Sequence, residues 1–272
     1  MKKTTMLAVI AIITSGGCSR DAIPAKIDAR INDVANGISR PYRQWTEKVD
    51  SLFADIGALD DPRQKITCLR RLADKVLEID VTAPDMEAPR SIAADITSLC
   101  RDRIVSRMQM SGGTIEDAWD VLIPMFAWMR TQADKLYGDG KLPKGTTRLK
   151  GGGLRTTDHE AYRQYAKRRD AYDLIATDYG SYLNFAEKRF PDPSNGTIDE
   201  SRIPALKKKI EKFLGRPMRT REQCEKDWYA GKFTELREWP GRSSAVKPAP
   251  KKGLDVDVDV ELPEDRAKES KQ

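Results

Sequence analysis

Few residues in this 272-residue chain could carry out catalysis. His159 is the only histidine, so a hydrolase that pairs a nucleophile with a histidine would have to use it. It falls in the first turn of an expected helix, where we predict exposure to solvent. Cys68, Cys100 and Cys224 lack the C-x-x-C spacing of zinc sites, and a single histidine excludes ligation by two histidines. The sequence therefore predicts no metal site, no cofactor and no catalytic triad.

A cluster of acidic residues lies at the start of another expected helix, at Glu116, Asp117 and Asp120. The partial positive charge of a helix N-terminus favours carboxylates there, which accounts for the cluster without catalysis. Glycoside hydrolases also use two carboxylates, but at a separation that a sequence does not define. Hydrolysis of glycan or peptide through these carboxylates is therefore kept as an alternative function.

Two segments carry a strong excess of positive charge. Residues 141–169 hold nine Lys or Arg against two acidic residues, and residues 202–221 hold eight against one. Residues 18–136, in contrast, hold 17 basic and 19 acidic residues. If both segments share a face, each cation contributes on the order of 1 kcal/mol near an anionic surface, screened beyond about 8 Å in physiological salt. The predicted contact residues are Lys141, Lys144, Arg148, Lys150, Arg155, Lys207, Lys208 and Lys209.

The N-terminus has the three parts of a bacterial export signal. Lys2 and Lys3 form a positive start, residues 6–13 are apolar, and the small residues 15–17 precede Cys18. The apolar run is shorter than the roughly 20 residues that cross a bilayer. The pattern therefore predicts a signal and not a permanent membrane helix.

Ser15-Gly16-Gly17-Cys18 resembles the lipobox of bacterial lipoproteins, with Ser15 where leucine is usual. The resemblance covers residues 1–18. It implies removal of residues 1–17, diacylation of the Cys18 thiol, acylation of the new amino group and, from Ser19, an outer-membrane address in a Gram-negative cell. Several acyl chains, at about 0.8 kcal/mol per buried CH₂, make such attachment stable. Ordinary secretion with cleavage near residue 17 is the alternative.

An exported chain meets an oxidising compartment, in which disulfides form. Cys68 and Cys100 lie on adjacent expected helices at equal distances along the chain from residue 84, in the turn between them. Residues equidistant from the turn of an antiparallel hairpin lie at one level, so a Cys68–Cys100 disulfide is predicted, worth roughly 2–4 kcal/mol. Two buried free thiols are the alternative, and Cys224 is expected to be buried.

Apolar residues recur at steps of three and four through most of residues 24–239, which is typical of helices with one buried face. Gly37 and Pro41 indicate either a kink or a boundary between two helices. The expected helix starts are Asp61 with Gln64, Thr114 with Asp117, Thr157 with Glu160, and Thr220 with Gln223. The sequence thus predicts an all-α bundle of six or seven helices, without strands.

The longest expected helix, from Thr157 to about Phe190, has an aromatic inner face. Its members are Tyr162, Tyr165, Tyr172, Tyr179, Tyr182 and Phe190. An aromatic row at helical spacing is usually core, and a stacking platform for a glycan or a base is the alternative. We expect this face to pack into the core.

The expected organisation has six parts. They are a signal peptide (1–17), a lipid-anchor tether (18–23), an N-terminal helical part (24–137), a flexible basic loop (138–156), a C-terminal helical part (157–239) and a disordered tail (240–272). The loop holds six glycines and one acidic residue, without the spacing of a phosphate-binding loop. The tail is rich in Lys, Pro, Ser and Asp and cannot offset its ordering entropy by burial.

These features favour a membrane-anchored envelope lipoprotein that binds or scaffolds an anionic or protein partner without catalysis. Lipid headgroups, lipopolysaccharide, teichoic acid or an acidic protein would fit the basic segments. An envelope hydrolase acting on cell-wall glycan or peptide is the alternative. A nucleic-acid partner is disfavoured, because a chain without residues 1–17 carries a net charge of only +4. The third hypothesis is a basic cytoplasmic protein without a true signal, whose binding to nucleic acid would fall steeply with salt. The sequence does not indicate an oligomeric state.

Overall fold

The computed structural model describes residues 22–38, 42–83, 86–150, 153–193 and 196–231. The elements are α1 (Ala25–Asn36), α2 (Tyr42–Gly57), α3 (Pro62–Val76), α4 (Pro89–Ser98), the π-helix η1 (Leu99–Ile104), α5 (Val105–Met110), α6 (Ile115–Tyr137), β1 (Thr146–Arg148), β2 (Leu154–Thr156), α7 (His159–Arg189), the 3₁₀-helix η2 (Glu200–Arg202), α8 (Ile203–Leu214) and α9 (Arg221–Tyr229). The predicted all-α fold is confirmed. Cys18, residues 1–17 and the tail 240–272 lie outside the described residues.

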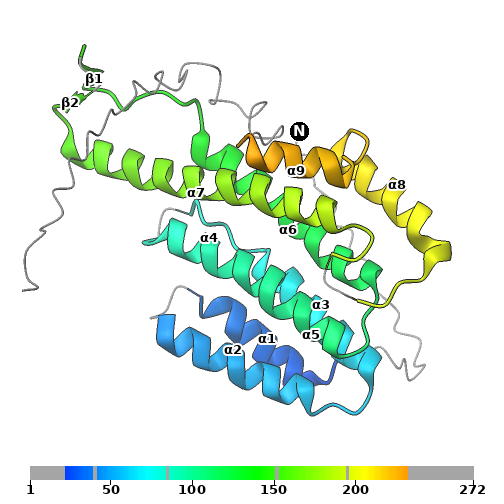
Figure 1. Cartoon of the computed structure of the whole chain (residues 1–272). Coiled ribbons are helices and arrows are strands. Elements are labelled where there is room, and N and C mark those ends of the chain that lie inside the picture. The colour runs from blue at the N-terminus through cyan, green and yellow to red at the C-terminus, as the bar shows by residue number, and fades with distance from the viewer. Residues whose placement is uncertain (1–21, 39–41, 84–85, 151–152, 194–195, 232–272) are drawn as a thin grey trace, which may run out of the picture.

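The helices pack around one continuous core. Figure 1 places the α4–η1–α5 rod between the α1–α2 pair and the α6–α7 pair, and α6 packs along α7. The open choice near Gly37 is settled in favour of two helices, because α1 ends at Asn36 and α2 starts at Tyr42. Among the described helices, none is both long and apolar enough to cross a bilayer.

Most helix starts follow the side chains that the sequence indicates. Thr114 and Thr220 each form a complete capping box, with Asp117 and Gln223 respectively, as predicted. The Asp61 side chain accepts a hydrogen bond from the Arg63 amide in the first turn of α3, also as predicted. These caps satisfy amide groups that have no partner within the helix.

Two details of the expected caps are wrong. The Gln64 side chain does not complete a box with Asp61; its Nε2 donates to the Ala22 carbonyl at 2.8 Å. The N-cap of α7 is Asp158 and not Thr157, because Asp158 accepts from the Ala161 amide at 2.9 Å. In the first case the Ala22 carbonyl takes the Gln64 donor, and in the second Asp158 takes the capping position of Thr157. The spacing of residues in the sequence does not decide between such nearby polar groups.

The aromatic face of α7 is divided between core and surface. Tyr172 and Tyr179 are fully buried, and the Tyr179 ring meets Phe126 of α6 edge-on at 5.9 Å between centroids. Tyr162 and Tyr165, in the first two turns, are only half-buried. The core interpretation is confirmed for the middle of the helix, and the boundary lies at Ala171, the first buried residue of α7.

The predicted absence of strands in residues 138–156 is wrong. Strands β1 and β2 form an antiparallel hairpin with Thr146 opposite Thr156 and Arg148 opposite Leu154. Each strand has three residues. That length is too short for an alternating pattern to stand out, and so the sequence does not reveal the hairpin.

The predicted Cys68–Cys100 disulfide is absent, and both residues are buried free thiols. The prediction assumed regular α-helix on both sides of the turn, whereas Cys100 lies in η1, whose wider turns change the direction of each side chain. Burial, with a smaller effect of Asp28, raises the pKa of the Cys68 thiol to about 11. Both burial and this raised pKa disfavour the reactive thiolate.

Candidate functional site

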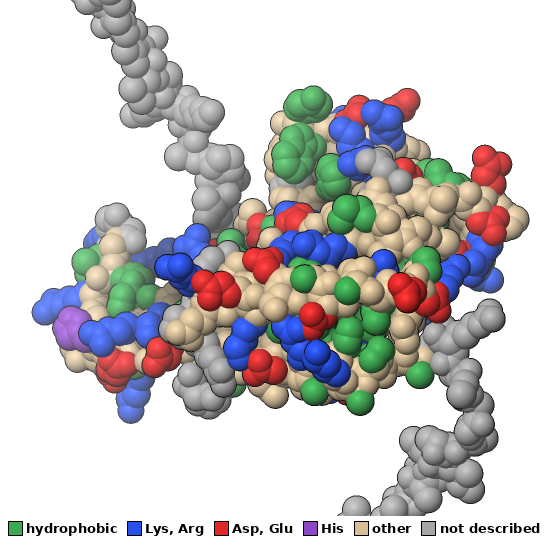
Figure 2. Space-filling model, turned by 90° about the horizontal axis from the view of Figure 1, so that it is seen from below, with side chains coloured by type: hydrophobic (Ala, Val, Ile, Leu, Met, Phe, Trp, Pro, Cys, Tyr) green, Lys and Arg blue, Asp and Glu red, His purple; other side chains and the backbone are tan. Residues whose placement is uncertain are grey.

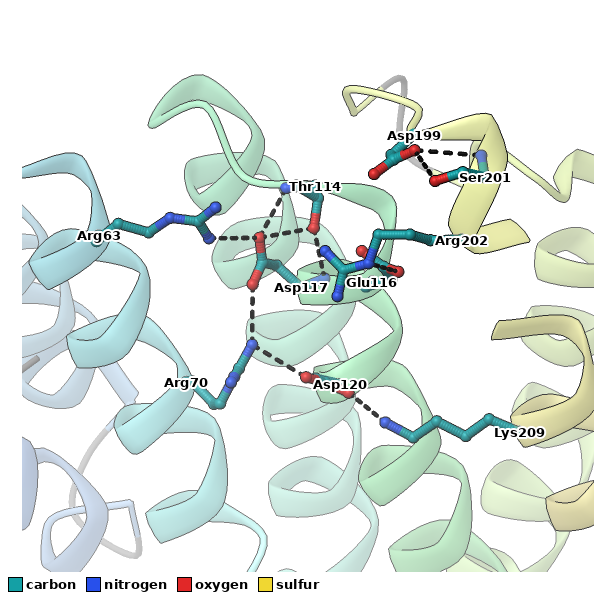
Figure 3. A network of polar contacts seen from close by, with 10 residues as sticks. All are labelled: Arg63, Arg70, Thr114, Glu116, Asp117, Asp120, Asp199, Ser201, Arg202 and Lys209. Carbon is teal, nitrogen blue, oxygen red and sulfur yellow. Dashed lines mark hydrogen bonds and ion pairs between the residues drawn. The ribbon is translucent and has the colours of Figure 1, made fainter. Parts of the chain in front are cut away.

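The acidic cluster at the start of α6 serves the fold. The Asp117 carboxylate accepts from the Thr114 amide at 2.7 Å and from Arg70 of α3 at 2.9 Å, with Arg63 at 3.5 Å (Figure 3). The Asp117 side chain is 10% exposed. This residue therefore caps α6 and ties it to α3 at the same time.

The other two carboxylates of the cluster are also ion-paired. Asp120 lies between Arg70, at 3.1 Å, and Lys209 of α8, and Glu116 pairs with Arg202 of η2 at 2.8 Å (Figure 3). The network thus joins α3, α6, η2 and α8. Carboxylates held in this way stabilise helix packing, and the geometry gives no support to a pair of catalytic acids.

The basic arm, as we name residues 141–169, projects from the bundle. Its five predicted contact residues, Lys141, Lys144, Arg148, Lys150 and Arg155, are all exposed. No residue of α7 between His159 and Asp170 is buried. Figure 2 shows Lys and Arg side chains gathered at one end of the molecule with the histidine, which is exposed as predicted.

The two basic segments do not share a face. Figure 1 places the hairpin beyond one end of α7, whereas α8 lies toward the other end. On α8, Lys207, Lys208 and Lys209 are exposed, but Lys209 pairs with Asp120 and Lys207 lies 4.0 Å from Glu211. The structure therefore separates the predicted contact residues into a projecting arm and a distant, partly neutralised patch.

A second feature, which the sequence does not reveal, is a cleft between η1, α5, α6, α7 and the end of α9. We name it the aromatic cleft, and its volume is about 590 Å³. Leu122 and Phe126 of α6 line it with apolar surface, and Phe185 of α7 and Trp228 of α9 add two aromatic rings. This size lies within the usual range for small-molecule sites, roughly 300–1,000 Å³.

Two arginines lie over aromatic rings of the cleft. The guanidinium of Arg101 lies 3.7 Å from the centroid of Tyr182, and that of Arg189 lies 5.3 Å from the centroid of Phe185. Arg101 also donates two hydrogen bonds to Asp102, at 2.6 and 2.7 Å. Stacking on a ring holds each guanidinium in a defined orientation.

Tyr182 lines the cleft, and its phenol interacts with Asp178, which lies one turn earlier on α7. Burial raises the pKa of Asp178, and the hydrogen bond from Tyr182 opposes part of that rise. Burial also raises the pKa of Tyr182, and the Asp178 charge adds to the effect. Perturbed groups cluster at functional sites, and Tyr182 is such a group at the cleft.

A buried ion cluster, which we name the clamp, fixes the segment after α8 to α7. The Glu187 side chain is fully buried and accepts two hydrogen bonds from Arg216, both at 2.9 Å, and others from Arg219, the shortest at 2.6 Å. Arg219 also donates to Asp227 of α9 at 3.0 Å. Burial alone would raise the pKa of Glu187, but the arginines outweigh it and hold that pKa below its usual value.

No family model, curated protein or solved structure matches this chain. Within the described ranges, no group of three His, Cys, Asp or Glu side chains is placed to hold a metal ion. The function therefore has to be inferred from the arm, the cleft and the clamp.

Faint sequence signals exist for the features that were missed. Glu187 follows Leu183 by four residues and so falls on the buried face of α7, where a lone charge requires a partner. Phe185 and Arg189 lie four residues apart on α7 and so share a face of that helix, which places an aromatic ring beside a cation. No comparable signal marks the π-helix that brings Arg101 into the cleft.

Proposed function

We propose that this chain is an exported lipoprotein, anchored through Cys18, that binds an anionic, phosphate-bearing envelope surface or polymer without catalysis. The projecting basic arm is the observation that carries the proposal. Its cations stand on a short hairpin and on a stretch of helix that has no buried residue between His159 and Asp170. The arm contacts the bundle at its base, where Arg168 donates to the Lys135 carbonyl at 2.9 Å and Arg169 lies 5.6 Å from the centroid of the Tyr137 ring.

The charges of the arm support this function. Of its nine basic residues, Lys141 pairs with Asp139 at 3.3 Å and Arg163 pairs with Glu160 at 2.9 Å, and all four side chains are largely exposed. Arg169 also forms an ion pair, with Asp173 at 3.5 Å. Exposed pairs of this kind contribute little and exchange readily for a polyanion. Association driven by such a surface is fast and depends strongly on salt.

The anchor is tested with the Cys18→Ala variant. We expect the wild type to take up a labelled fatty acid and to fractionate with membranes, because a chain acylated at Cys18 binds a bilayer stably. The variant is expected to lose both the label and the membrane association. An unlabelled wild type in the soluble fraction would contradict the lipoprotein proposal.

The arm is tested by neutralising Lys144, Arg148 and Arg155 to glutamine in the Cys18→Ala background. Binding to phosphatidylglycerol vesicles at physiological salt is expected to weaken about tenfold, since three surface cations are lost and salt screens each of them. The salt dependence of the remaining binding should also be flatter. Co-sedimentation at several salt concentrations gives both quantities.

The matched control removes the same charge from α8, with Lys207, Lys208 and Lys212 changed to glutamine. It leaves Lys209 in place, because that lysine pairs with Asp120. Vesicle binding is expected to change little. An equal loss in both variants would assign the attraction to net charge and remove the arm from the proposal.

A further inference from the structure

We propose that the aromatic cleft is a second binding site, for a small amphipathic anion with a flat aromatic body and one acidic group. It goes beyond the proposed function, because the cleft is built from η1, α5, α6, α7 and α9, outside the basic arm. The inference rests on three properties of the cleft, which are its apolar lining, its exposed rings and its charge.

The apolar lining is large enough for a fused-ring ligand. Leu122, Phe126 and Ala186 come from the facing sides of α6 and α7 and are almost fully buried in the fold. A cleft of about 590 Å³ with such surface gains free energy from every apolar contact that displaces water. The aromatic body of the ligand would lie against this surface.

The two exposed rings favour a flat ligand. Phe185 is 49% exposed and Trp228 is 53% exposed, although aromatic side chains usually bury most of their surface. Both line the same cleft and come from different helices. Ring stacking on such side chains is worth about 1–3 kcal/mol per aromatic base in nucleic-acid complexes, and it does not depend on a particular pattern of polar atoms.

The charge of the cleft selects an anion. Arg101 and Arg189 line it together with a single acidic residue, Asp102, which gives a local net charge of +1. The cleft opens to water beside an apolar lining, where an ion pair is stronger than on a flat surface. Asp102 already pairs with Arg101, so the excess positive charge of the lining would attract an acidic group on the ligand toward Arg189.

The π-helix supplies the reason why Arg101 and Asp102 reach the cleft. Both belong to η1, which interrupts the continuous rod formed by α4 and α5. Single π-helical turns cost regular hydrogen bonding and occur frequently at functional sites. Here the π-helical turn places Arg101 and Asp102 in the wall of the cleft, where a ligand would meet them.

The experiment compares two fluorescent probes with closely related aromatic bodies, using the full chain. One is 8-anilinonaphthalene-1-sulfonate, which is anionic, and the other is N-phenyl-1-naphthylamine, which is neutral. We expect saturable binding of the anionic probe at one site per chain and weaker binding of the neutral probe. Arg189→Met is expected to lower the affinity for the anionic probe about tenfold and the affinity for the neutral probe less than twofold. Trp228→Ala should weaken both at least fivefold.

Matched variants separate the cleft from other surfaces. Tyr229→Ala removes an exposed ring next to Trp228, and Arg163→Met removes an exposed cation from the other end of α7. Neither should alter the binding of either probe. The neutralised arm variant should also keep full affinity for the anionic probe, which makes this test independent of the proposed function.

Three outcomes would overturn the proposal. The first is the absence of saturable binding of the anionic probe. The second is an equal loss of affinity for both probes in Arg189→Met, and the third is a loss of affinity for the anionic probe in the arm variant. Far-ultraviolet circular dichroism identical to that of the wild type shows that each variant is folded. A variant that fails this check is replaced by Phe185→Ala, which removes the exposed ring beneath Arg189 and should weaken both probes.

Discussion

Replacement of Glu187 by alanine is expected to lower the free energy of unfolding by about 3–5 kcal/mol, the usual cost of removing one partner from a buried ion pair. Glu187 is fully buried, and the side chains of Arg219 and Arg216 that it holds are only 10% and 25% exposed. Without the carboxylate, Arg219 keeps Asp227 and Arg216 keeps the Pro217 carbonyl as acceptors, but the charged hydrogen bonds of both arginines to Glu187 are lost. Urea unfolding followed by circular dichroism measures the change.

The control for this prediction is Glu225→Ala on α9. Glu225 pairs with Lys188 at 3.1 Å and with Arg221 at 3.4 Å, but these groups are solvent-exposed to a considerable degree. Surface pairs contribute little, so the control should unfold close to the wild type. Equal losses in the two variants would show that the clamp adds no more than an ordinary surface pair.

The clamp also predicts a dependence on pH. The pKa of Glu187 is lowered in the folded protein, so its contribution is fully present above the unfolded value, near 4.5. That contribution is lost as pH falls through the lower folded pKa. The stability difference between wild type and Glu187→Ala should therefore shrink below about pH 4.5, and a difference that grows on acidification would contradict the assigned charge state.

Replacement of Asp117 by alanine is expected to lower the free energy of unfolding by about 2–3 kcal/mol. A lost capping interaction costs about 1 kcal/mol, and the lost charged hydrogen bond to Arg70 adds a similar amount or more. The loss stays modest because Arg70 and Arg63 are 39% and 61% exposed, so water solvates them once the carboxylate is gone. Thermal and urea unfolding measure the effect.

Asp173→Ala provides the comparison for Asp117. Asp173 pairs with Arg169 one turn away on α7, and its side chain is 53% exposed, so little change is expected. Two conservative variants address the hydrolase alternative. Degradation of isolated cell wall that disappears in stably folded Asp117→Asn or Asp120→Asn would give these carboxylates a catalytic role and contradict the structural one.

The sequence predicted those features that depend on neighbours along the chain. Thr114 with Asp117 and Thr220 with Gln223 were recognisable because a capping box is a local pattern with a fixed spacing. The exposure of His159 followed from its place in the first turn of a helix. The burial of Tyr172 and Tyr179 followed from helical periodicity.

Features that depend on packing between distant segments could not be predicted. The equidistance argument for Cys68 and Cys100 failed because nothing in the sequence marks η1. The two basic segments could have shared a face, and only the course of α7 places the hairpin and α8 apart. The cleft needs Arg101, Phe185 and Trp228 from three elements, a combination that no local pattern encodes.

The exposed start of α7 has a mechanical consequence. Its first 12 residues, 159–170, extend about 18 Å at 1.5 Å per residue ahead of Ala171, where burial begins, and Arg168 ties the base of this stretch to the Lys135 carbonyl at 2.9 Å. This reach is about twice the roughly 8 Å over which charges act in physiological salt. Salt therefore screens the positive charges at the tip of the arm from most of the slightly acidic residues 18–136. A polyanion held at the tip would respond to the local charge of the arm, whatever the net charge of the protein behind it.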